Sequence, residues 1–359
     1  MKDVLPMPQE PSDQSRQSGL IIRRDAELAI LPNAASSALN EIISKSLAHI
    51  QTCKTLTVPE RKGGEEREFE IAPGVKIVMC WIPPGEFLMG SSEKEDDRRS
   101  DETQHFVKIT KGFWLSKTQI TQAQWIAVMG NNPSYSNGEE LPVERVSWND
   151  ICGNETRTGG FLGAVNKTAS EGERFDLPTE AQWEYACRAG TTGPYYANID
   201  EIAWYKENSG GKTHPVAKQK PNAWGLHDMH GNVWEWCSDW YGAYDVSASI
   251  DPDGTASGSR RVGRGGDWHL VAGYCRAATR KSGGPDGSYD YVGFRLVRCS
   301  VPAAPNAFPT ASSGRTRMDS TTSPKTSAKP LNATYREKLL EACRKEEARR
   351  KAEANKKPY

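Results

Sequence analysis

The side chains that could do chemistry are most concentrated in residues 231–240, which read GNVWEWCSDW. Tryptophans flank Glu235 on both sides, and Asp239 directly precedes a third tryptophan. An indole ring is large and apolar, and its N–H group needs an acceptor when the ring is buried. A carboxylate set between two such rings must be hydrogen-bonded, paired with a cation or bound to a metal. The segment is therefore predicted to form the centre of a compact fold, with Glu235 as a candidate site residue.

Cysteine and histidine are the other residue types that could do chemistry here. The eight cysteines are scattered without a Cys-x-x-Cys pair, which excludes zinc-ribbon spacing. Cys237 and Cys275 are the pair that a fold could bring together, as buried thiols, as a disulfide or as a displaced metal site. His227 and His230 share the sequence HDMH, but we expect surface or core histidines there rather than metal ligands. The sequence shows no Ser-His-Asp signature, Walker loop or dinucleotide fingerprint.

The bulk composition excludes several classes of partner. Lysine plus arginine and aspartate plus glutamate both number 46, so the net charge is zero and favours neither nucleic acid nor an anionic membrane. No apolar run approaches the ~18 residues of a transmembrane helix. Residues 1–24 are polar and contain three prolines, unlike a secretory signal. We therefore expect a cytoplasmic protein.

Shifts in composition divide the chain into five parts. Residues 1–34 are polar and predict a disordered N-terminus, whereas residues 35–68 show one apolar stripe at helical spacing and predict an amphipathic helix and a linker. Residues 69–300 are the globular body. Residues 301–331 are rich in Pro, Ser, Thr and Ala and predict a flexible linker, and residues 332–359 predict a charged helical tail. The two flanking helices are candidates for binding a protein partner, although the first could instead pack on the body.

Within the body, the residue patterns predict an α+β fold that is rich in loops. One helix is expected over Thr121–Met129, opened by its threonine and closed by Gly130. Another begins at Thr179, where Thr179 and Gln182 form a capping box and Gly190 is the C′ residue. The expected strands are 76–82, 87–89, 105–109, 112–115, 262–264 and 293–297.

The order of these motifs resembles the formylglycine-generating enzyme family, also called the sulfatase-modifying-factor domain. The matching segments are IPPGEFLMG at 82–90, TQITQAQW at 118–125, NPS at 132–134, PVERVSW at 142–148, the helix at 177–190, NAWGL at 222–226, the tryptophan segment, RGG at 264–266 and GFR at 293–295. The resemblance covers about residues 75–297. It implies a C-type-lectin-like fold with the N- and C-terminal helices flanking it.

The resemblance bears on redox chemistry, because oxidases of this family hold copper with two cysteines. Those positions fall on Leu270 and Ala272 here, and Cys275 lies near them but on neither. Cu(I) is a soft ion that prefers thiolates, commonly two of them. We therefore expect no copper and no oxidation of a sulfatase cysteine. The alternative is an oxidase of the same type with a rearranged site at Cys237 and Cys275.

The resemblance also implies a structural calcium ion on the turn that leads into the tryptophan segment. Calcium takes hard oxygen ligands from carboxylates and backbone carbonyls. The family positions match Asp228, Gly231, Val233 and Glu235. The alternative is that Glu235 pairs with an arginine such as Arg295. A second family calcium maps onto Asn208 and Gly210.

The loops over residues 267–291 are expected to form a binding face, as in lectin-like folds. They are rich in Gly, Ser and Tyr, which suit adaptable recognition, although ordinary loops share this composition. The residues expected to bind a peptide, a protein or a small ligand are Trp234, Trp268, His269, Tyr274, Tyr289 and Tyr291. Retroelement-diversified binding proteins vary these loops and are a further alternative, but they usually end soon after Gly-Phe-Arg, whereas this chain continues. The sequence therefore predicts a binding module of this family.

Overall fold

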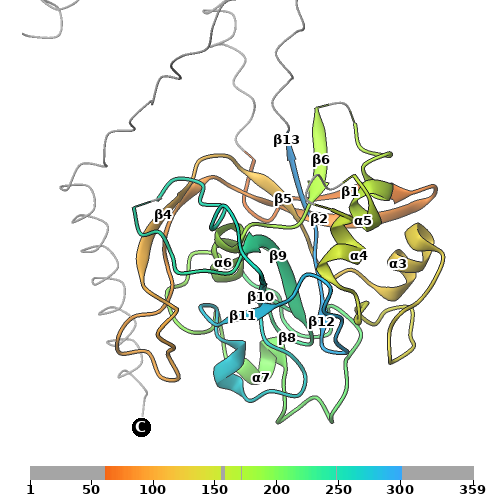
Figure 1. Ribbon diagram of the computed structural model, residues 1–359. Coiled ribbons are helices and arrows are strands. Elements are labelled where there is room, and N and C mark those ends of the chain that lie inside the picture. The colour runs from red at the N-terminus through yellow and green to blue at the C-terminus, as the bar shows by residue number, and fades with distance from the viewer. Residues whose placement is uncertain (1–60, 155–157, 171, 248, 301–359) are drawn as a thin grey trace, which may run out of the picture. The chain divides into compact units, whose positions relative to one another are not determined.

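The computed structural model describes residues 61–154, 158–170, 172–247 and 249–300 (Figure 1). The chain divides into two units, Met1–Glu60 and Arg61–Tyr359, and all the described residues lie in the second. The predictions for the N-terminus, the two flanking helices and the C-terminal linker fall outside the described residues. The body itself begins slightly before the expected residue 69, because its first strand starts at Glu66.

The larger sheet has five strands in the order β1-β2-β5-β13-β6. They are β1 (Glu66–Ala72), β2 (Val75–Ile82), β5 (Phe113–Ser116), β13 (Val297–Ser300) and β6 (Glu173–Asp176). Successive side chains of a strand point to opposite faces. Accordingly, Ile77 and Met79 of β2 pack into one core cluster, whereas Cys80 and Ile82 pack into another. Both faces of this sheet are therefore covered.

The smaller sheet has the order β11-β10-β9-β12 and contains the tryptophan segment. Its strands are β9 (Trp234–Trp240), β10 (Arg261–Arg264), β11 (Arg280–Gly283) and β12 (Val292–Gly293). Two short pairs complete the strands: β3 (Gly85–Met89) with β4 (His105–Ile109), and β7 (Ala203–Trp204) with β8 (His230–Gly231). The loops over residues 267–291 leave this smaller sheet at the ends of β10 and β11.

The helices are short and are mostly capped as the sequence predicts. They are α3 (Gln122–Met129), α4 (Trp148–Cys152), α5 (Gly160–Val165), α6 (Glu180–Arg188), α7 (Ile199–Ile202) and the 3-10 turn η1 (Ala272–Cys275). Thr121 caps α3, and Thr179 with Gln182 forms the predicted capping box of α6. Helix α6 ends as predicted: Ala189 is its C-cap residue (φ 42°), and Gly190 follows as the C′ residue (φ 89°).

Two strand predictions need correction. The expected strand 293–297 is divided into β12 and β13, because the stretch between them turns from one sheet to the other: Phe294 O accepts from Ile120 N and Leu296 O from Ser116 N. The tryptophan segment forms a strand, β9, that the pattern did not reveal. Nearly every β9 residue is buried, so the apolar–polar alternation that marks a half-exposed strand is missing.

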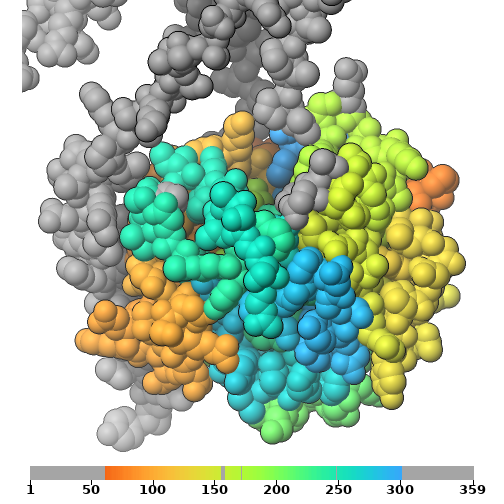
Figure 2. Space-filling view, in the orientation of Figure 1, coloured from red at the N-terminus to blue at the C-terminus, as the bar shows by residue number. Residues whose placement is uncertain are grey.

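The expected α+β, loop-rich body is confirmed. Figure 2 shows that residues near 260–300, drawn in cyan and blue, lie on the visible face between the orange segment near 85–110 and the yellow segment near 120–150. Within the described part of the chain, we find no helix with the length and apolar character needed to span a bilayer.

Candidate functional site

Glu235 is fully buried in β9, and both of its oxygens are saturated with donors. Oε1 accepts from Arg295 Nη2 (2.8 Å) and Gln119 Nε2 (3.1 Å). Oε2 accepts from Arg295 Nε and Trp183 Nε1, both at 2.6 Å. A carboxylate offers about four lone-pair sites, and all four are used. The predicted alternative of a Glu235–Arg295 ion pair is therefore confirmed.

The carbonyl oxygens expected to bind calcium converge on a side-chain amide. Gln119 Nε2 lies 3.3 Å from Asp228 O, 3.4 Å from Gly231 O and 3.0 Å from Val233 O. Asp228 presents its backbone carbonyl to this point, while its side-chain Oδ2 accepts from Ala217 N and its Oδ1 is buried without a partner in the described structure. Burial raises the pKa of Asp228 to about 6. The donor set in this arrangement does not fit the expected calcium ion.

The other candidate metal residues are also engaged elsewhere. The side-chain amide of Asn208 accepts a hydrogen bond from Tyr205 N and donates one to Ala203 O. Gly210 lies beside open space, with no atom within 4 Å of the position that a Cβ would take. His227 Nδ1 lies 2.8 Å from Gln219 O, and His230 Nδ1 lies 2.6 Å from Cys275 O. Burial lowers the pKa of His230 to about 4. In the part of the chain that the structure covers, no three His, Cys, Asp or Glu residues group as a metal site.

Cys237 and Cys275 are both fully buried and carry free thiols. They pack in different core clusters, Cys237 with Trp183 and Cys275 with Tyr205. Burial raises the pKa of each thiol well above its usual value. A thiol held protonated is a poor nucleophile and metal ligand. The structure therefore does not bring these two cysteines together at a surface.

The predicted binding face contains a hollow of about 230 Å³ beside β9 and β11. It is lined by Arg99, Asp101, Trp234, Tyr241, Leu270, Tyr274, Arg280, Lys281 and Ser282. Leu270, which the sequence resemblance matched to an oxidase cysteine position, lines this hollow with an apolar side chain. Trp234 forms its floor and is 2% exposed, and its Nε1 has no hydrogen-bond partner among the described residues.

Lys281 is a cation of this face that the sequence reasoning missed. Its Nζ lies 4.2 Å from the ring centroid of Tyr291, 5.4 Å from that of Tyr289 and 5.6 Å from that of Trp234. No described residue forms a hydrogen bond or ion pair with it. Burial lowers the pKa of Lys281. The charge of Asp267 attracts this ammonium without forming an ion pair within the described structure, so the ammonium is available to a ligand.

Asp267 and His269 form a polar pair at the edge of the same face. Asp267 is fully buried, and its Oδ1 lies 2.8 Å from His269 Nδ1 and accepts from two backbone N–H groups. Its Oδ2 is buried without a partner in the described structure, and burial raises its pKa. The ring of His269, 4.9 Å from that of Tyr291, is oriented by this contact. Tyr291 in turn stacks on Tyr289 at 5.3 Å.

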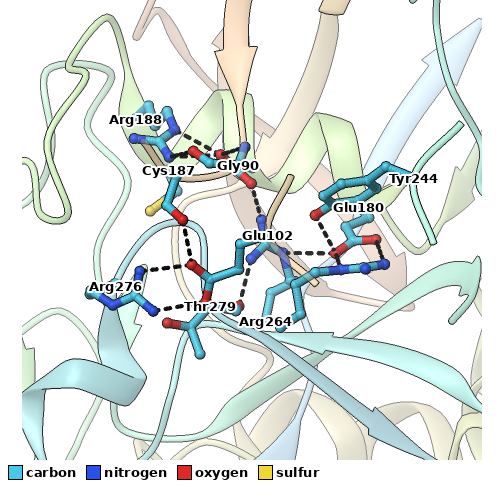
Figure 3. Close-up of polar contacts among 12 residues, drawn as sticks. Gly90, Glu102, Glu180, Cys187, Arg188, Tyr244, Arg264, Arg276 and Thr279 are labelled. Carbon is cyan, nitrogen blue, oxygen red and sulfur yellow. Dashed lines mark hydrogen bonds and ion pairs between the residues drawn. The ribbon is translucent and has the colours of Figure 1, made fainter. Parts of the chain in front are cut away.

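A second hollow of about 350 Å³ lies next to buried ion pairs. Arg280 lines both hollows and pairs with both oxygens of Glu180, which also accepts from Tyr244 Oη (3.0 Å). Figure 3 shows how Arg264 continues this network inward toward the turn at Gly90. Asp239 lines the second hollow without a cation: its Oδ2 accepts from Glu180 N and Ser238 Oγ, and burial with the nearby Glu180 raises its pKa to about 7.

The structure thus links Trp268, His269, Tyr291 and Tyr289 in a chain of ring contacts and places Tyr274 with Trp234 around the hollow. The residues predicted for the first calcium ion lie instead at the start of β9 and in the turn before it. The residues missed were Gln119, Lys281 and Asp267. Only Asp267 carried a local signal, since an aspartate two residues before a histidine can orient its ring.

Comparison with known proteins gives one family over most of the described chain. A model of the sulfatase-modifying factor enzyme 1-like domain matches residues 70–300. The formylglycine-generating enzyme of Streptomyces coelicolor is 35% identical over 207 residues, which cover 52% of this chain and 60% of the relative. The serine/threonine-protein kinase pkn1 of Chlamydia pneumoniae is 40% identical over 238 residues, covering 61% of this chain and 38% of the relative. The chain thus spans little more than half the length of the formylglycine-generating enzymes it matches.

Solved structures agree with this match. Treponema denticola variable protein 1 is 30% identical with a TM-score of 0.56, and PvdO from Pseudomonas aeruginosa is 28% identical with a TM-score of 0.58. Each comparison covers 66% of this chain and 99% of the other.

Proposed function

Since this chain belongs to the sulfatase-modifying-factor, or formylglycine-generating enzyme, family, we propose that its domain binds a ligand on the 267–291 face and does not carry out copper oxidation. The observation that carries the proposal is the lining of the 230 Å³ hollow. Leu270 stands there at an oxidase cysteine position, and none of the lining residues is a cysteine. The hollow instead offers aromatic rings and the ammonium of Lys281.

These groups suit a peptide or protein segment better than a metal. Tyrosine and tryptophan give a large contact area at a low cost in conformational entropy, and interface residues of these types carry much of the binding free energy. His269 and Lys281 add donors that can fix the orientation of a polar ligand.

The binding function is tested by selecting peptides from a displayed random library on the full chain and measuring their affinity by calorimetry. Lys281→Met and His269→Ala should each weaken binding at least tenfold, or by about 1.4 kcal/mol. Tyr135→Ala removes an aromatic ring that is 72% exposed outside this face, and it should leave the affinity unchanged. Peptides that bind all variants equally would place the binding surface elsewhere.

The redox part of the proposal is tested by titration with Cu(I). We expect no tight binding, and no difference between the wild type and Cys275→Ser, because both buried thiols resist deprotonation. A cysteine-containing sulfatase peptide should give no aldehyde in the presence of O₂. Tight copper binding that Cys275→Ser abolishes, together with turnover of the peptide, would establish the rearranged oxidase instead.

A further inference from the structure

The side-chain amide of Gln119 stands at the point on which the oxygens at the start of β9 converge. Gln119 is fully buried, and its Nε2 lies 3.0–3.4 Å from three carbonyl oxygens and one carboxylate oxygen. Such a group of buried oxygens needs a donor or a cation, because unpaired acceptors of this kind are costly to bury. We propose that Gln119 takes the structural role of a cation here, so that the fold needs no calcium ion.

The orientation of the Gln119 amide is fixed by the backbone. Asn232 Nδ2 donates to Gln119 Oε1 (3.1 Å) and to His214 O (3.1 Å), while Asn232 Oδ1 accepts from His214 N (3.0 Å). A backbone N–H group and a carbonyl cannot exchange roles, so they set which way the Asn232 amide points. Asn232 then holds the oxygen of Gln119 toward itself and the nitrogen toward β9. Rotating Gln119 to present an oxygen to a metal would break this chain of bonds.

The charges at this place are balanced without a metal. Glu235 forms a two-point ion pair with Arg295, which is itself fully buried. Calcium lies 2.3–2.6 Å from its oxygen ligands, so it would have to displace the Gln119 nitrogen, which is also one of the donors to Glu235. Asp228 is the one group that favours a cation, because its Oδ1 is buried without a partner in the described structure. Restoring a site should therefore require removal of the Gln119 amide alone.

The test is the melting temperature of the full chain in EDTA and in millimolar CaCl₂, with MgCl₂ and NaCl as ionic controls. A ligand present at a hundred times its Kd raises the melting temperature of a domain of this size by roughly 5–10 °C. We expect no such shift for the wild type. A saturable rise with calcium, absent with magnesium, would overturn the proposal.

Substitutions at Gln119 test the contribution of its side-chain amide apart from that of the neighbouring residues. Gln119→Glu puts a carboxylate among the oxygens, so its melting temperature should fall in EDTA and recover by several degrees in calcium. Gln124→Glu makes the same charge change nearby, can keep the capping box of α3, and should not respond to calcium. If Gln119→Glu does not fold, the melting temperature of Gln119→Ala provides a second test. A lower melting temperature in EDTA supports the role of the amide, and an unchanged one overturns it.

Discussion

Buried carboxylates in this domain differ in whether an arginine accompanies them. Glu235 pairs with Arg295 and Glu180 with Arg280, so each of these buried carboxylates has a cation beside it. Asp239 is 3% exposed and accepts only from a backbone N–H group and a serine hydroxyl. The groups facing it are Glu180 on α6 and Asp253 beside the second hollow. Without a cation, its ionised form is the less stable one inside the fold.

This asymmetry predicts a pH dependence of stability. Burial, followed by the charge of Glu180, raises the pKa of Asp239 to about 7, whereas an unfolded aspartate titrates near 3.9. The folded state therefore holds the extra proton between these values, so the stability from this group is complete below pH ~4 and lost as the pH rises through ~7. Asp239→Asn removes the titration. Relative to the wild type, it should gain up to about 4 kcal/mol in free energy of unfolding between pH 4 and pH 8.

Urea unfolding of both proteins at several pH values measures this difference. Asp253→Asn is the matched control, because this exposed residue lines the same hollow. Its substitution should change the free energy of unfolding by less than about 0.5 kcal/mol. An Asp239→Asn effect that stays constant from pH 4 to pH 8 would show that this carboxylate is ionised throughout.

Among the helices and strands, the sequence predicted those features that depend on interactions between residues close together in the chain. The capping boxes of α3 and α6 lie within four consecutive residues, so the sequence revealed both helix starts. The edges of β4 were also predicted correctly. Strand β9 was not, because it is covered on both faces and shows no alternation. The loop-rich, C-type-lectin-like fold of the family came from the order of motifs, which periodicity alone does not provide.

The candidate site divides in the same way. The aromatic residues of the binding face are close in sequence, and their clustering was predictable from the loops that carry them. Lys281 reaches those rings from β11, and Gln119 reaches Glu235 from a segment more than a hundred residues away. Contacts of that range depend on the packing of whole elements and leave no pattern in the local sequence. For this reason the sequence predicted a calcium ion beside Glu235 and did not reveal the side-chain amide of Gln119 there.

At the scale of the whole molecule, buried arginines join segments that are remote in the chain. Glu184 on α6 accepts from Gly90 N (2.8 Å) and Arg188 Nε (2.8 Å) and pairs with Arg264 of β10 (Figure 3). Arg264 also donates to Thr279 O (2.5 Å), just before β11. One carboxylate therefore ties the end of β3, helix α6 and the smaller sheet together beneath the binding face.

This arrangement predicts that Glu184→Gln destabilises the entire domain. Removing one partner of a buried ion pair leaves the other charge uncompensated and costs about 3–5 kcal/mol, and both Glu184 and Arg264 are fully buried. Glu201→Gln breaks the exposed pair with Lys220 and should cost no more than about 1 kcal/mol.

Equilibrium unfolding in urea, followed by tryptophan fluorescence and by far-ultraviolet circular dichroism, gives both values. Coincident transitions at a lower midpoint are expected for Glu184→Gln, because the network joins the end of β3 and helix α6 to the smaller sheet. Separate transitions, or a cost equal to that of Glu201→Gln, would mean that α6 and the smaller sheet are held together by their apolar contacts alone.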